Sequence, residues 1–251
     1  MKSIYITIKI LIREHTIYRI KKIVKGILLR KVPPYDYIEQ FTLDNIHKYI
    51  GVENNDILSW CIVGGKLGNE IPIILKNFPN VNVLVFECSN RYLGRLENRF
   101  KDEPKVQVAP KAVSDNSGVA TFFETSLEGS GSLLPLGELH MNLFSSSPAE
   151  TFQIETVTLD DYLEGKSLDV LWVDIQGAED KLLKGATNTL SRTKAIFIEV
   201  SDRANLYHGS APMAEINSLL IQNGFTLVGL GYDFNLTGNA LYLKSEIVIH
   251  Y

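Results

Sequence analysis

The sequence predicts an α/β fold built on one mostly parallel sheet. Short apolar runs alternate with helical patterns along most of the chain. The apolar runs are continuous, which is typical of strands that are buried on both faces. The first two runs are joined by one helical pattern, as a parallel βαβ unit requires. A length of 251 residues allows one such domain with a full core.

The βαβ unit spans Leu58 to Glu87 and predicts a ligand site at the carboxyl ends of its strands. Gly64, Gly65 and Gly68 follow the first strand, where residues without Cβ let the backbone turn and approach a ligand. Glu87 closes the second strand roughly 20 residues further on, where dinucleotide folds keep an acid for ribose hydroxyls. A nucleoside ligand is the prediction. The glycine spacing differs from G-x-G-x-x-G, so a plain tight turn and a solvated carboxylate stay open as alternatives.

The other elements follow in chain order. A helix is expected over 38–50, a helix capped by Ser89 or Asn90 over 93–100, and a third strand over 105–108 with 112–115 trailing from it. Residues 116–158 are expected to form an antiparallel insertion and a flexible loop beside the site. Its partly alternating strands, 119–123 and 151–157, are separated by the polar segments 129–132 and 145–148.

Beyond the insertion, a short helix begins at Thr158, and a buried fourth strand over 170–173 ends at Asp174. One helix over 179–190 precedes a fifth strand over 195–198, which ends at Glu199. A helix over 214–222 and a hairpin of strands 225–230 and 240–243 complete a seven-stranded sheet.

Charge divides the chain at Pro33-Pro34 into a basic arm, residues 1–34, and an acidic domain, residues 35–251. Residues 1–31 hold nine Lys or Arg and one Glu, whereas the remainder holds 16 basic and 28 acidic residues. An acidic domain does not favour nucleic-acid binding, which needs a cationic surface. The arm is expected to be helical, since apolar residues recur at helical spacing over 20–28. It could lie on an anionic membrane surface, or pack on the domain or on an oligomer partner.

No apolar stretch approaches the ~20 residues that span a bilayer, and no secretory signal is evident at the start. We therefore expect a cytoplasmic protein, with the arm as its one candidate for peripheral membrane contact. Cys61 and Cys88 fall in or just after central strands and are expected to be reduced and buried. No spacing of Cys and His indicates a metal site.

The motif Asp174-Ile175-Gln176-Gly177-Ala178-Glu179, with Leu183-Lys184-Gly185-Ala186 after it, resembles the FkbM-type family of S-adenosylmethionine-dependent methyltransferases. Six further motifs arrive in the order of that family: Val63-Gly64-Gly65 to Gly68, Phe86-Glu87, Ala112-Val113-Ser114-Asp115, Gly131-Ser132-Leu133, Val157-Thr158-Leu159-Asp160 and Ile198-Glu199-Val200. The resemblance covers about residues 57–230.

The resemblance implies a Rossmann-like, seven-stranded class I methyltransferase sheet with a reversed last strand, and S-adenosylmethionine as cofactor. Carried over, Val63, Gly64, Gly65 and Gly68 line the methionine side of the cofactor, and Glu87 accepts the ribose hydroxyls. Ser114 and Asp115 would flank the adenine, and Asp174 would face the transferring methyl group. The chain departs from the family at Ile62-Val63, where an acid is usual, at Lys66 in place of Asn, and at Gln176 in place of Glu.

Asp174 is the first candidate for the catalytic base, with Glu199 and His208 as further candidates; the alternative for Asp174 is a cap on the following helix. We expect an O-methyltransferase acting on a hydroxyl of a small polar acceptor, and the resemblance favours a sugar or glycan intermediate. A degenerate protein that binds a nucleoside or a partner without catalysis is the alternative, prompted by Ile62 and Gln176. A nicotinamide oxidoreductase is disfavoured by the glycine spacing.

Overall fold

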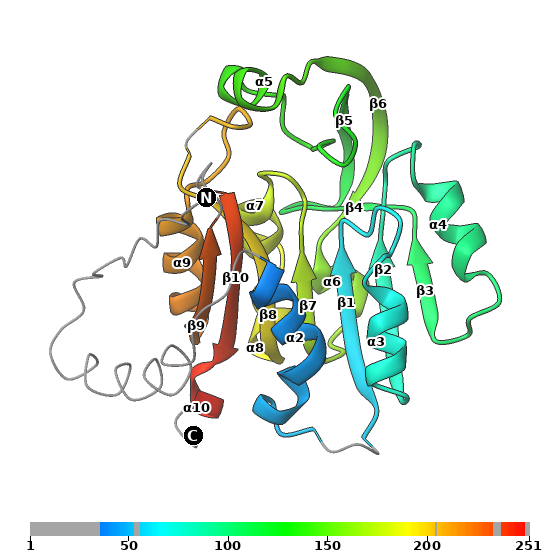
Figure 1. The fold of residues 1–251 in the computed structure, drawn as a ribbon, viewed down its shortest axis with the longest axis vertical. Coiled ribbons are helices and arrows are strands. Elements are labelled where there is room, and N and C mark those ends of the chain that lie inside the picture. The colour runs from blue at the N-terminus through cyan, green and yellow to red at the C-terminus, as the bar shows by residue number, and fades with distance from the viewer. Residues whose placement is uncertain (1–35, 53–55, 204, 233–236, 249–251) are drawn as a thin grey trace, which may run out of the picture.

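A computed structural model describes residues 36–52, 56–203, 205–232 and 237–248. They form a seven-stranded sheet in the order β3-β2-β1-β7-β8-β10-β9 (Figure 1). The strands are β1 (Leu58–Val63), β2 (Val81–Phe86), β3 (Val106–Ala109), β7 (Leu168–Val173), β8 (Thr193–Ser201), β9 (Phe225–Tyr232) and β10 (Thr237–Lys244). β1, β2, β3, β7 and β8 are parallel, whereas β10 runs antiparallel to both β8 and β9. The predicted α/β class and terminal hairpin are confirmed.

The sheet separates two hydrophobic cores, and β1 shows how the sequence produces them. Successive side chains of a strand point to opposite faces. Cys61 and Val63 therefore join one core, while Trp60 and Ile62 join the other, and all four are almost fully buried. This two-sided burial explains the continuous apolar run.

Helices cover both faces of the sheet. The core that contains Trp60 is covered by α2 (Asp36–Tyr49), α3 (Ile71–Asn77), α4 (Leu93–Phe100) and α10 (Ser245–Val248), of which α2 and α3 lie in front of the sheet in Figure 1. The core that contains Cys61 is covered by α6 (Leu159–Leu163), α7 (Glu179–Lys184), α8 (Thr187–Ser191) and α9 (Met213–Gln222). Among the described residues, no helix is long and apolar enough to cross a membrane.

The insertion stands at the top of Figure 1, beyond the carboxyl ends of the parallel strands. It contains β4 (Ala112–Val113), β5 (Gly118–Thr125), α5 (Glu138–Phe144) and β6 (Pro148–Val157). β5 and β6 are antiparallel as predicted, but β4 adds to β6 in parallel and belongs to this second sheet. The helix α5 was not predicted, since this stretch was expected to be loop.

Two local predictions are wrong. The helix expected over 179–190 is divided into α7 and α8, because Gly185 lies against the Ser114 backbone, where a Cβ would overlap its carbonyl oxygen. α4 begins at Leu93 and its N-cap position is Tyr92, so neither Ser89 nor Asn90 caps it. Thr158, by contrast, caps α6 by accepting a hydrogen bond from the Asp161 amide. The predicted arm, residues 1–34, lies outside the described residues.

Candidate functional site

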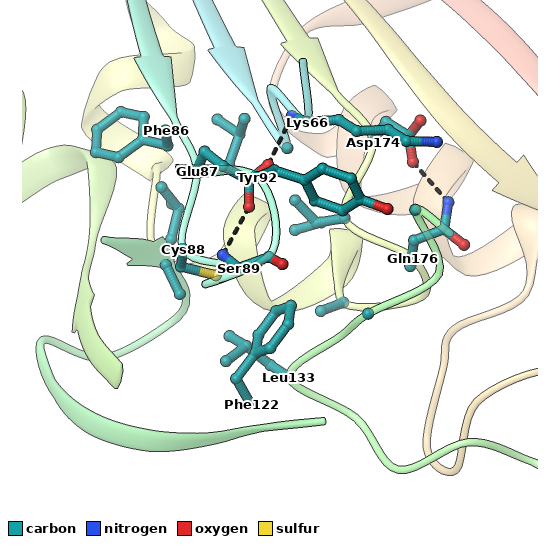
Figure 2. Close-up of a pocket in the computed structure, with 18 of the residues that line it drawn as sticks. Lys66, Phe86, Glu87, Cys88, Ser89, Tyr92, Phe122, Leu133, Asp174 and Gln176 are labelled. Atoms are coloured by element: carbon teal, nitrogen blue, oxygen red, sulfur yellow. Dashed lines mark hydrogen bonds between the residues drawn. The ribbon is translucent and has the colours of Figure 1, made fainter. Parts of the chain in front are cut away.

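A cavity of about 660 Å³, including its open mouth, lies at the carboxyl ends of β1, β2 and β7 (Figure 2). Residues from the first two strands, the insertion and the turn after β7 line it: Val63, Gly64, Lys66, Phe86, Glu87, Cys88, Ser89, Tyr92, Lys111, Ala112, Val113, Phe122, Glu124, Gly129, Gly131, Leu133, Asp174, Ile175, Gln176 and Ala178. The location is the one that the βαβ unit predicts.

The three glycines after β1 have different tasks. Gly64 lines the cavity with a φ of 89°, and a Cβ there would overlap the Asp174 carbonyl oxygen, so only glycine lets β1 and β7 end side by side. Gly65 and Gly68 lie outside the cavity lining. A Cβ at Gly65 would overlap Val85, and one at Gly68 would crowd Ile71 and Phe100. These two glycines bring the loop against β2 and the helices α3 and α4.

Glu87 is buried at the centre of the cavity wall. Its two carboxylate oxygens accept hydrogen bonds from the backbone amides of Lys66 (2.6 Å) and Ser89 (2.7 Å). Desolvation by burial raises the pKa of Glu87 to about 7. Each oxygen keeps a second lone pair, so Glu87 is able to accept two hydroxyl donors from a ligand.

One end of the cavity is apolar. Cys88, Ala112 and Phe122 form a small buried cluster there, against which Leu133 packs. Burial raises the pKa of the Cys88 thiol, which keeps it neutral. Ser114 and Asp115, predicted to flank an adenine, are not among the residues that line the cavity. The Ser114 backbone bonds instead to Val157 and lies against Gly185.

A second cavity, of about 1190 Å³ including open space, shares Lys66, Gly129, Asp174 and Gln176 with the first. It is otherwise lined by residues of the insertion, the turn after β7, α7, β8, the loop after β8, α9 and β10: Leu127, Glu128, Ser130, His140, Phe144, Gly177, Glu179, Glu199, Val200, Ser201, Leu206, Tyr207, Ser210, Ala211, Ile216 and Thr237. Asp174 therefore stands at the border of two spaces that could hold two different ligands.

Gln176 joins two carboxylates, that of Asp174, which directly follows β7, and that of Glu199, which lies in β8. Its Nε2 donates hydrogen bonds to Asp174 Oδ1 (2.7 Å) and to Glu199 Oε2 (2.8 Å). Its backbone has a φ of 57°, a left-handed conformation that is uncommon for residues other than glycine. The turn thus holds two acidic side chains together without a third negative charge. Glu199, expected at a strand end, lies inside β8, which continues to Ser201.

Tyr207 and His140 complete this network and were not predicted. The Tyr207 hydroxyl lies 2.9 Å from Gln176 Oε1, 3.0 Å from the Ser130 carbonyl oxygen and 3.3 Å from His140 Nε2. His140 Nδ1 lies 2.7 Å from Ser146 Oγ. Burial raises the pKa of Tyr207 and lowers that of His140, so both side chains stay neutral near pH 7. The predicted candidate next in sequence, His208, is exposed and lines neither cavity.

Asp174 is exposed and does not cap α7, whose N-cap position is Ala178 with no side-chain cap. Glu179 holds the turn that precedes α7, because its Oε1 accepts hydrogen bonds from the amides of Ile175 and Gly177, both at 3.2 Å. Desolvation by burial raises the pKa of Glu179 to about 7. The Asp174 carboxylate is thus left to face the two cavities.

The sequence is similar to one known protein family and to a characterised relative. Residues 68–227 match the methyltransferase FkbM domain, which covers more than half of the chain. The chain belongs to the FkbM methyltransferase family. Its cofactor is S-adenosylmethionine. A curated relative, the 2-O-methyltransferase NoeI of Sinorhizobium fredii, is 28% identical over 172 residues, which are 63% of this chain and 69% of NoeI.

Solved structures show the fold of this FkbM-family protein at low identity. A putative rRNA-methylase from Clostridium thermocellum is similar with a TM-score of 0.50 and 9% identity, over 85% of this chain and 97% of the other. A SAM-dependent methyltransferase from Aquifex aeolicus is similar with a TM-score of 0.41 and 12% identity, over 90% and 98% of the two chains. The family match, the order of the seven strands and the similarity to the Clostridium thermocellum structure together confirm the class I methyltransferase fold expected from the sequence.

The residues of the first cavity fit the cofactor of the FkbM family. A buried carboxylate that faces the cavity, Glu87, suits the ribose hydroxyls, and the apolar cluster around Phe122 suits a planar base. The departure from the family at Ile62 does not alter this wall, because the Ile62 side chain lies in the core on the other face of the sheet. Ile62 therefore does not support the alternative of a degenerate protein that binds a nucleoside without catalysis.

Proposed function

We propose that this FkbM-family protein transfers a methyl group from S-adenosylmethionine to a hydroxyl oxygen of a small polar acceptor, such as a sugar or glycan intermediate. The observation that carries the proposal is the border position of Asp174, between the cavity that contains Glu87 and the second, larger cavity. The nucleoside half of the cofactor suits the first cavity, and the acceptor suits the second. The 2-O-methyltransferase activity named for NoeI supports oxygen as the methylated atom.

The lining of the second cavity supports a hydroxylated acceptor. Hydroxyl, carboxylate and imidazole groups from Ser130, Glu199, His140 and Tyr207 border it, and such groups hold hydroxyls by hydrogen bonds. The acidic lining and the excess of acidic residues beyond residue 31 do not favour a polyanion such as RNA.

The protein has two tasks in this reaction. The bound cofactor supplies a methyl group already activated on a sulfonium, so that the carbon–sulfur bond breaks as the carbon–oxygen bond forms. The chain aligns the acceptor oxygen and accepts its proton. The Asp174 carboxylate accepts that proton. Gln176 holds the Asp174 side chain beside Glu199 through its two hydrogen bonds.

Two measurements test this function. Calorimetry with S-adenosylmethionine, S-adenosylhomocysteine and NAD should show binding of the first two ligands only. Transfer of a radiolabelled methyl group is then measured with neutral sugars, amino sugars, sugar phosphates and RNA as acceptors. We expect transfer to hydroxyls of an uncharged or amino sugar. Binding of the cofactor together with transfer to RNA alone would contradict the proposed acceptor class.

A further inference from the structure

Lys66 is a cation at the junction of the two cavities. It lines both of them, and the shared border also contains Asp174 and Gln176. Figure 2 shows Lys66, Asp174 and Gln176 on the side of the pocket away from Phe86 and Cys88. Because the apolar cluster marks the opposite end, Lys66 lies at the polar end of the first cavity.

The fold holds Lys66 in place at both its backbone and its side chain. Its φ is 47°, in the left-handed region, and its amide donates the 2.6 Å hydrogen bond to Glu87. The side chain runs across Gly129, where a Cβ would overlap its amino group, and the Nζ lies 5.7 Å from the centre of the Tyr92 ring. The absence of a side chain at Gly129 therefore leaves room for the ammonium group.

The ammonium group has little to balance its charge. It lies 3.5 Å from the Glu128 carbonyl oxygen, and no ion pair joins it to a carboxylate within the described ranges. The other lysine of the first cavity, Lys111, does form an ion pair, with Glu155. A partly buried ammonium without a carboxylate partner favours an anionic ligand.

We propose that Lys66 binds the α-carboxylate of the methionine moiety of S-adenosylmethionine. The inference rests on the proposed function, in which the ribose lies at Glu87 and the base lies at the apolar end. The amino-acid end of the cofactor must then extend away from Phe122, along the loop that follows β1. Lys66 is the cation on that side of Glu87, and a carboxylate is the group of this ligand that it is able to pair with.

The experiment compares two ligands that differ only in that carboxylate. Dissociation constants of S-adenosylmethionine and of decarboxylated S-adenosylmethionine are measured by calorimetry for wild type, Lys66→Gln and Lys66→Arg. We expect Lys66→Gln to weaken S-adenosylmethionine binding about tenfold, since a charge-assisted hydrogen bond is lost, and to change binding of the decarboxylated ligand less than about twofold. Lys66→Arg should restore most of the difference.

Lys111→Gln is the matched control, because Lys111 lines the same cavity but pairs with Glu155. It should not discriminate between the two ligands. Equal weakening of both ligands by Lys66→Gln would overturn the inference, since Lys66 would then act through the loop or Glu87. No change for either ligand, with a raised KM for an anionic acceptor, would also overturn it.

A wild-type measurement keeps the inference testable if Lys66→Gln does not fold. Added salt should weaken binding of S-adenosylmethionine more than binding of the decarboxylated ligand, because only the former has the ion pair. Equal salt dependence would overturn the inference. Cofactor binding of the expected pattern without methyl transfer to any hydroxyl would contradict the proposed function and leave the assignment of Lys66 intact.

Discussion

At the scale of single residues, Glu87 decides whether the first cavity binds a nucleoside. Replacing Glu87 with Ala should weaken S-adenosylmethionine binding at least about tenfold, because two charge-assisted hydrogen bonds of about 1.5–3 kcal/mol each are lost. Calorimetry measures the affinity, and thermal unfolding without ligand checks that the fold survives. If Glu87→Ala bound the cofactor as well as wild type does, the placement of the nucleoside would be wrong.

The raised pKa of Glu87 predicts a pH dependence of binding. The free protein protonates this carboxyl below about pH 7, whereas hydroxyl donors favour the carboxylate. Affinity for S-adenosylhomocysteine should therefore increase between about pH 6 and pH 8, with release of a proton on binding. Calorimetry at several pH values should show this trend in wild type and in Glu179→Gln, but not in Glu87→Gln. A flat profile in wild type would contradict the assignment.

The same raised pKa makes the free energy of unfolding decrease with increasing pH, whereas it makes the affinity for the ligand increase. An unfolded glutamate has a pKa of about 4.3, so the folded state holds the Glu87 proton more tightly than the unfolded state does. The part of the free energy of unfolding that depends on this proton is fully present below about pH 4.3 and is lost as the pH rises through about 7. Thermal unfolding of the ligand-free protein measures this effect. Glu87→Gln should not show the decrease in stability that wild type shows between about pH 4.3 and pH 7.

Replacing Asp174 should affect catalysis but not cofactor binding. Asp174→Asn should leave cofactor affinity within a few-fold of wild type but abolish methyl transfer, because the amide keeps the shape and cannot accept the proton. The two measurements are calorimetry and radiolabelled transfer. Loss of both together would make Asp174 a cofactor ligand or a structural residue instead.

At the scale of elements, the turn between β7 and α7 controls the charge beside Asp174. Gln176→Glu would place a third carboxylate near those of Asp174 and Glu199, and the three like charges would repel one another. The acidic limb of the profile of kcat/KM against pH should move to higher pH. Glu70, Glu179 and Lys66 are the other charged groups near this turn.

Tyr207→Phe is the control for this variant, because it removes the bond at the other end of the same amide without adding charge. It should leave the acidic limb closer to its wild-type position. A profile that moves equally in both variants would indicate that Gln176 acts through the conformation of the turn alone.

Elements with a strong local pattern could be predicted, and elements that depend on distant contacts could not. The runs around Trp60 and Trp172 are buried on both faces, so their strands are evident in the sequence. The helix α5 has seven residues and packs through His140 against Tyr207, 67 positions further on. No local pattern marks such a pair. The sequence analysis predicted a functional residue on the loop after β8. It named His208, but the residue of this loop that faces the cavity is its neighbour Tyr207.

Glu87 and Asp174 could be located from the sequence because each directly follows a strand of the predicted parallel sheet. The positions of Ser114 and Asp115 could not, because they depend on how β4 leaves the main sheet to join β6. Their role beside the adenine stays a prediction.

At the scale of the whole molecule, the basic arm should be dispensable for cofactor binding. Every residue that lines the first cavity lies between Val63 and Ala178. Deleting residues 1–31 should leave the dissociation constant of S-adenosylmethionine unchanged in calorimetry. A loss as large as that of Glu87→Ala would contradict this prediction. Flotation with anionic liposomes, with and without the arm, tests membrane contact separately, and binding at low salt that requires the arm would support it.

The antiparallel β10 has a consequence for how the protein is made. β10 lies between β8 and β9, and it pairs Asn239 with Glu199 beside the second cavity. During synthesis, β8 therefore keeps an open edge of unpaired amides and carbonyls until residues 237–244 have left the ribosome. Such an edge on an apolar strand is prone to aggregation. A chain released after β9 would be a substrate for chaperones, and the wall of the second cavity becomes complete only once β10 has been made and has paired with β8.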